Sequence, residues 1–168
     1  MSRAVEQVWK IVVAAKGRAK ERLERALADA RRELQRLMDE AALADGELDE
    51  AQGRRLAHEE RIAQLLSDPN GLSPVTYVDL DRYRTPLAQA VDQARAAVRR
   101  AAEAVEEQER TIEQLGIDIR RADASLDAAR EQLRKVIAAA QRRVEERADE
   151  EAGETAAARL FRGGSKHV

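Results

Sequence analysis

The sequence predicts an all-α fold, a long antiparallel two-helix coiled-coil hairpin. Three observations predict it: a sustained seven-residue apolar repeat, one concentrated turn signal, and the composition. Of the 168 residues, 37% are charged and only 2% are aromatic, which is typical of long helices and coiled coils. A wide globular core of this size would normally contain several aromatic side chains. We therefore expect one elongated unit over residues 1–152, followed by a flexible basic tail over residues 153–168.

The first helix is expected over about residues 4–67. Apolar side chains recur there at steps of three and four residues from Val5 to Leu65, which places them on one face of a helix. Two successive steps of four around Leu23 form a stutter, and a stutter locally loosens a supercoil. The repeat is otherwise regular enough to form one side of a coiled-coil seam.

The turn is expected over about residues 68–75. An Asn-Gly dipeptide and two prolines lie within residues 67–74, and this density of turn residues is found nowhere else in the chain. Just beyond them, Thr76 and Asp79 have the spacing of a capping box. The second helix is therefore expected to begin at Thr76.

The second helix is expected over about residues 76–151. Its apolar repeat is continuous over residues 91–140, with Gln108 as the only polar seam residue, and a repeat held this long specifies a coiled-coil seam. Pro86 removes a backbone donor and disfavours helical geometry at Thr85. The unbroken apolar spacing across Pro86 favours a kink, and the alternative is a new helix capped by Thr85.

Two such helices joined by a short turn must run antiparallel. A turn centred near Gly71 makes residues face each other when their numbers sum to about 143, which places His58 near Thr85. At about 1.5 Å per residue the hairpin would be roughly 90–110 Å long, and the second helix would project some ten residues past the first. The same seam allows a domain-swapped dimer, but the turn residues favour a closed monomer.

Composition argues against several classes of function. The formal charge of −2 comes from many interleaved charges of both signs, which gives no general attraction to nucleic acid. There is no cysteine, which excludes disulfides and thiolate metal sites. No apolar run approaches the ~18 residues of a membrane span, and Glu6 and Lys10 interrupt the N-terminal apolar run that a signal peptide would need. We expect a cytoplasmic location.

The sequence predicts a non-enzyme without metal or cofactor. Catalysis needs polar groups that converge in a concavity, which a two-helix hairpin does not provide. The two histidines, His58 and His167, lie far apart in the chain. We interpret His58 as a tolerated polar residue of the seam, and contact with a partner protein is the alternative.

Two regions of the sequence carry more large apolar or aromatic side chains than a two-stranded coiled-coil seam requires. The first, the terminal tip, lies where the two ends of the chain meet at one end of the predicted hairpin. It combines surplus apolar residues with basic residues: Val8, Trp9, Ile11, Val13, Lys16, Arg18, Arg142, Arg143 and Arg147. It could be a set of hydrophobic staples against fraying, a docking site for a protein, or an anchor on a membrane surface. The second, the tyrosine cluster, comprises Tyr77, Leu80 and Tyr83. It either caps the core or forms a recognition patch, since tyrosine is favoured at interfaces.

The chain as a whole resembles a known family. A helix of about sixty residues, a Pro/Gly turn, the sequence Tyr83-Arg84-x-x-Leu87, and a long Ala/Arg/Glu/Gln helix resemble the FliJ/YscO stalk proteins of flagellar and virulence-associated type III secretion, especially of Hrp-type systems. The resemblance implies a hairpin similar to the rotary stalk of F-type ATPases. It implies that the terminal tip enters a hexameric secretion ATPase, and that the tyrosine cluster contacts the export gate or secretion chaperones.

Two other functions stay open at this point. One is a membrane-associated hairpin whose N-terminal amphipathic segment senses lipid, and the other is a generic structural coiled-coil scaffold. The sequence does not identify the secretion system or the direct partners.

Overall fold

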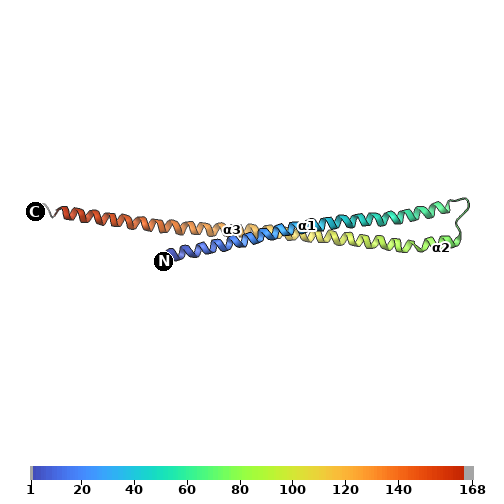
Figure 1. Cartoon of the computed structure of the whole chain (residues 1–168), viewed down its shortest axis with the longest axis horizontal. Coiled ribbons are helices and arrows are strands. Elements are labelled where there is room, and N and C mark those ends of the chain that lie inside the picture. Colours follow the sequence, from blue (N-terminus) through green and yellow to red (C-terminus); the bar gives the residue numbers. More distant parts are fainter. Residues whose placement is uncertain (1, 165–168) are drawn as a thin grey trace. The chain divides into compact units, whose positions relative to one another are not determined.

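A computed structural model describes residues 2–164 as three helices and no strand (Figure 1). The first, α1, spans Ser2–Leu66; α2 spans Pro74–Arg82; and α3 spans Arg84–Gly164. The predicted all-α antiparallel hairpin is confirmed, because α1 packs against a second arm that is bent between α2 and α3. The predictions on residues 165–168, including His167, lie outside the described residues.

Contacts between the helices group the chain into two units. One unit contains the residues up to Glu24 and those from Ile117 onward, and the other is Arg25–Gly116, which includes the turn. In α1 the boundary falls between Glu24 and Arg25, next to Leu23, where the sequence predicts a stutter. Each unit is an antiparallel pairing of a segment from α1 with a segment from the second arm.

The turn after α1 is built from local hydrogen bonds. The Asp68 carboxylate accepts from the Asn70 backbone amide at 3.0 Å, and the Asp68 carbonyl accepts from the Gly71 amide at 2.9 Å. Gly71 has a φ of 73°, a left-handed conformation that glycine adopts without the steric penalty of a Cβ atom. The predicted turn is therefore present.

The start of the second arm differs from the prediction. Ser73 is the N-cap, its hydroxyl accepts from the Thr76 amide at 3.2 Å, and Pro74 begins α2. A serine cap followed by proline is a favoured helix start, because the fixed φ of proline suits a position whose amide needs no partner. The capping box predicted for Thr76 and Asp79 is therefore wrong by one turn.

The predicted kink beside Pro86 is confirmed. Tyr83 interrupts the helical hydrogen bonding but keeps helical dihedral angles, φ −78° and ψ −14°. Its amide donates to the Leu80 carbonyl at 3.2 Å, a tighter pairing than that of an α-helix. Pro86 has no amide to offer the Arg82 carbonyl. The helix therefore bends at Tyr83 and resumes at Arg84, and Thr85 is not the cap of a new helix.

The C-terminal part of α3 extends further than predicted. It continues to Gly164, so the predicted end near Glu151 is wrong. The residues around Gly153 are mostly Ala, Glu and Arg, which have high helix propensity, and one glycine costs only about 1 kcal/mol. Whether residues 153–168 behave as a separate flexible tail stays a prediction.

The core of each unit is a narrow seam between its two antiparallel segments. The buried apolar residues of the described chain all lie at predicted seam positions: Ala30, Ala51, Ile62, Val91, Leu126 and Ala129. The predicted register also agrees with the contacts. Lys20 lies 2.7 Å from Asp123, and Arg84 lies 2.9 Å from Glu59. In both pairs the residue numbers sum to 143, as the predicted register requires.

Candidate partner-binding surfaces

The N-terminal part of the terminal tip presents an apolar ridge. Val5, Val8 and Ile11 are exposed on α1, and we call them the N-terminal ridge. Trp9 and Val13 are only partly exposed, because they lie closer to the seam. Of the predicted surplus residues Trp9, Ile11 and Val13, only Ile11 is thus exposed, whereas Val5 and Val8, which the apolar repeat predicts in the seam, are exposed instead.

The basic residues of α1 are used in different ways. The Lys16 ammonium donates to the Ser125 hydroxyl at 2.5 Å, so it ties α1 to α3 within the first unit. Arg18 is exposed and makes no ion pair with any residue of the described chain. Of these two predicted tip residues, Arg18 is the one available to a partner.

Next to Lys16, the pair Lys20–Asp123 clamps the same helices. The hydrogen bond from Lys20 holds the pKa of Asp123 below its ordinary value, and the nearby positive charge adds to this effect. The same bond raises the pKa of Lys20. The pair is thus most favourable when both groups are charged.

The C-terminal part of the tip is a helix without a partner. Every residue from 141 to 164 is exposed, and we call this segment the overhang. With the observed register, Ser2, the first residue of α1, lies opposite residue 141. From residue 141 onward, α3 therefore has no part of α1 beside it. The overhang is more than twice as long as the predicted projection, because α3 does not end near Glu151.

The overhang carries the predicted basic residues and an apolar end. Arg142, Arg143 and Arg147 lie near its base. Leu160 and Phe161, near its far end, are 78% and 83% exposed. The sequence predicts both residues as the outer part of the terminal tip, within the region that it also assigns to a flexible tail.

Tyr77 belongs to a structural network rather than a free patch. The Arg84 guanidinium donates to both carboxylate oxygens of Glu59, at 2.9 and 3.1 Å, and to Asp81 at 3.1 Å. Its carbon atom lies 6.0 Å from the centre of the Tyr77 ring, within the range of a cation–π contact. The hydrogen bond with Glu59, followed by that with Tyr77, raises the pKa of Arg84. These contacts favour the capping role for Tyr77.

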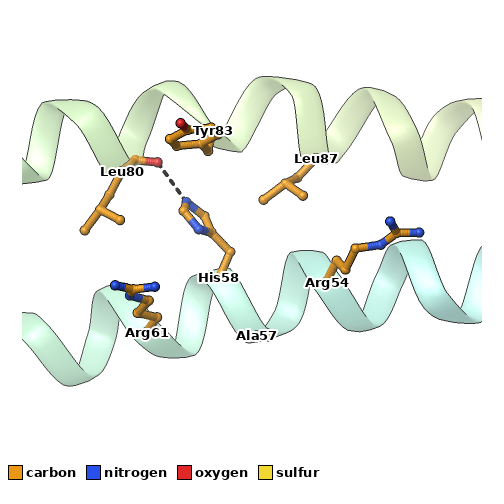
Figure 2. Close-up of a pocket in the computed structure, with 7 residues that line it drawn as sticks. All are labelled: Arg54, Ala57, His58, Arg61, Leu80, Tyr83 and Leu87. Atoms are coloured by element: carbon orange, nitrogen blue, oxygen red, sulfur yellow. Dashed lines mark hydrogen bonds between the residues drawn. The ribbon is translucent and has the colours of Figure 1, made fainter.

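Leu80 and Tyr83 instead border an open groove at the helix bend (Figure 2). Tyr83 is 62% exposed, and its ring meets His58 edge-on, with centroids 6.2 Å apart. The groove measures about 570 Å³, and we call it the bend groove. Its lining residues are Arg54, Ala57, His58, Arg61, Leu80, Tyr83 and Leu87.

His58 fills a seam position with a polar contact. Its Nε2 atom lies 2.8 Å from the Leu80 carbonyl oxygen, so this nitrogen carries the proton and donates. The carbonyl is reachable because the helix bends beside it. The Nε2 atom of His58 thus has a hydrogen-bond partner within the chain, as expected of a tolerated seam residue. The edge of its ring still lines the bend groove.

Sequence reasoning missed the arginines of this groove. Arg54, His58 and Arg61 are spaced as i, i+4 and i+7, which places them on one face of α1. That spacing was a usable signal. The spacing alone does not identify a site, because charged residues at such positions are also typical of the solvent-exposed flank of a coiled coil.

Residues 2–164 hold no group of three or more His, Cys, Asp or Glu side chains arranged to bind a metal ion. Within this range no helix has the length and apolar character needed to cross a membrane.

Comparison with known protein families gives a match to most of the chain. The bacterial type III secretion protein (HrpB7) family matches residues 4–160, whereas no curated protein and no solved structure matches the chain. The resemblance to type III secretion proteins predicted from the sequence is thereby confirmed. Because the match takes in nearly the whole of its length, the chain belongs to the bacterial type III secretion protein (HrpB7) family.

Proposed function

We propose that this protein is a non-enzymatic stalk of the cytoplasmic side of a type III secretion apparatus, and that it couples a hexameric secretion ATPase to export. The terminal tip docks into the ATPase ring, while Leu80 and Tyr83 of the tyrosine cluster face the export gate or secretion chaperones, with Tyr77 supporting them from within the chain. Membership of a type III secretion family supports a role in the apparatus. The docking surfaces rest on the geometry of the chain.

The overhang is the observation that carries the proposal. A helix with no facing helix lacks the tertiary packing that supplies most helical stability, and large apolar residues at its far end gain nothing from exposure. A partner that surrounds the helix would cover Leu160 and Phe161 and would meet Arg142, Arg143 and Arg147. A ring with a central hole presents such a surface on all sides of an inserted helix.

The N-terminal ridge supports the same assignment. Val5, Val8 and Ile11 are exposed in the unit that also contains the overhang. Apolar residues at the centre of an interface supply most of its binding energy, and charged residues at the rim tune its orientation. Arg18 and Arg143 would serve at such a rim.

The test compares binding to the purified ATPase hexamer. The double variant Leu160→Ser/Phe161→Ser removes the exposed apolar end without touching the seam. We expect it to weaken binding by about tenfold or more, since two buried apolar anchors are lost at the interface. Val75→Ser is the matched control, because Val75 is 73% exposed beside the turn and should leave binding unchanged.

Unchanged affinity of the double variant, measured by sedimentation with the hexamer, would contradict docking through the overhang. Trp9→Ala and Arg143→Glu extend the test to the rest of the tip. If all of these variants bind like the wild type, the terminal tip is not the ATPase-facing surface.

A second candidate function is supported by the N-terminal ridge alone. Exposed Val8 and Ile11 beside Arg18 also suit an amphipathic helix that lies on an anionic membrane. Flotation with phosphatidylglycerol vesicles separates the two functions. Strong vesicle binding in the absence of any protein partner, lost in Val8→Glu, would place the membrane role first.

A further inference from the structure

We propose that the bend groove binds an acidic amphipathic segment of a partner protein. Carboxylates of that segment bind Arg54 and Arg61, and an apolar side chain between them lies against Leu80, Tyr83 and Leu87. The inference deepens the proposed contact of the tyrosine cluster with a gate or chaperone and rests on that proposal. The proposed contact surface is thereby narrowed to one groove and one kind of ligand.

The floor of the groove is apolar and open for a physical reason. Ala57 is small, and His58 stands where the seam would otherwise carry Leu or Ala. The bend at Tyr83 then leaves its ring largely exposed beside Leu80 and Leu87, across from α1 (Figure 2). A volume of about 570 Å³ lies within the usual range of binding pockets.

Two arginines flank this floor. Arg54 and Arg61 are seven residues apart on α1, which separates their backbones by about two helical turns, or ~10 Å. Figure 2 shows His58 between them, pointing toward Tyr83 and the Leu80 carbonyl. The positive ends of the groove therefore bracket its apolar centre.

Both arginines are available to a partner. Arg61 makes no ion pair within the described chain. Within the same range Arg54 makes polar contacts only with Glu50: its Nε donates to the Glu50 carbonyl at 3.4 Å, and its guanidinium lies 3.9 Å from the Glu50 carboxylate. Both side chains are largely exposed, so these long contacts within one helix contribute little. Arg84 shows the contrast, because it is held by Glu59 and Asp81.

The groove's surroundings favour a carboxylate ligand over a polyanion. Guanidinium groups pair with carboxylates through two parallel hydrogen bonds. Glu50, Glu59 and Glu60 lie on the same stretch of α1 and would repel a continuous run of phosphates from nucleic acid or a lipid surface. A helix with two acidic residues seven positions apart and Leu, Phe or Trp between them matches the spacing of the groove.

The test selects a displayed library of random 16-residue peptides on the full chain. Peptides that also bind the double variant Arg54→Glu/Arg61→Glu are removed. We expect the enriched peptides to carry paired Asp or Glu residues around a bulky apolar residue. Measured by fluorescence anisotropy, Arg54→Glu and Arg61→Glu should each weaken the best peptide by about tenfold. Tyr83→Ala should also weaken it.

Arg99→Glu is the matched control, since Arg99 is an exposed arginine of the same unit with no ion pair in the described chain. The proposal is overturned if no peptide is enriched, if enriched peptides lack acidic residues, or if Arg99→Glu weakens binding as much as Arg61→Glu. Tighter binding of an oligonucleotide or of phosphatidylglycerol vesicles, lost in the same double variant, would also overturn it. The assay contains no ATPase, so its outcome is independent of docking through the overhang.

Discussion

The ion pair between Lys20 and Asp123 makes stability depend on pH at both ends of the range. The folded chain holds the pKa of Asp123 below its ordinary 3.8 and the pKa of Lys20 above its ordinary 10.5. The contribution of Asp123 is complete above about pH 4 and is lost as the pH falls through its lowered pKa. That of Lys20 is complete below about pH 10 and is lost as the pH rises through its raised pKa.

Asp123→Asn should therefore lower the melting temperature at pH 7, and this difference should shrink as the pH falls below 4. Circular dichroism over pH 2–9 at low salt measures the difference from wild type, which should shrink in 1 M NaCl because salt screens exposed pairs. Asp127→Asn is the control, since Asp127 approaches only Arg130 within its own helix, at 3.8 Å. A difference for Asp123→Asn that stays constant between pH 7 and pH 2 would show that the pair does not account for it.

The apolar seam concentrates stability in few side chains. Ile62 is 2% exposed, and cutting it to alanine removes three carbons from a seam that has little else to bury. Ile62→Ala should lower the free energy of unfolding by about 2–4 kcal/mol. Urea unfolding measures this change. Leu56→Ala, at a site 61% exposed, should stay within about 0.5 kcal/mol, and equal losses at both sites would contradict a narrow seam.

The overhang is the helical element whose stability depends most on propensity. It has no facing helix, so each residue contributes through its backbone preference and local charge pairs. Gly153 lies in its middle, and a Cβ atom added there would meet nothing within 4 Å. Gly153→Ala should thus stabilise the overhang by up to about 1 kcal/mol.

Amide hydrogen exchange measures this effect segment by segment. Exchange over residues 141–164 should slow in Gly153→Ala, while the amides around Leu126 and Ala129 stay unchanged. Gly46→Ala is the matched control, because Gly46 is a helical glycine of the other unit, also with open space around it. Slowing in the overhang by Gly46→Ala, or none by Gly153→Ala, would contradict an independently fraying helix.

The sequence predicted the buried face of the helices correctly but placed some helix ends wrongly. The apolar repeat placed Ile62, Val91 and Leu126 in the seam correctly, because a period of three and four residues leaves one face for burial. The end of α3 was wrong, because a single glycine is a weak stop when its neighbours favour helix. The cap at Ser73 was missed because two capping patterns stood three residues apart, and only backbone geometry separates them.

For the molecule as a whole, topology was predictable and the bend groove was not. Two apolar repeats and one turn leave only an antiparallel pairing, with a register fixed near 143 by the turn. The groove needs the bend at Tyr83, the polar seam residue His58 and the flanking Arg54 and Arg61 together. Each of these features has an ordinary structural interpretation alone, so only their arrangement in space reveals a site.

The same topology predicts a closed monomer. The turn after α1 is short and internally hydrogen-bonded, and the chain contains no native cysteine. In the double variant Lys16→Cys/Ser125→Cys, which replaces two side chains in contact, a short bismaleimide linker should therefore join the thiols within one chain. Gel electrophoresis under denaturing conditions should show a monomer of altered mobility, and Lys16→Cys alone should show none. In a domain-swapped dimer these positions meet only between chains, so a product of twice the mass at low protein concentration would establish the swap and exclude the closed hairpin.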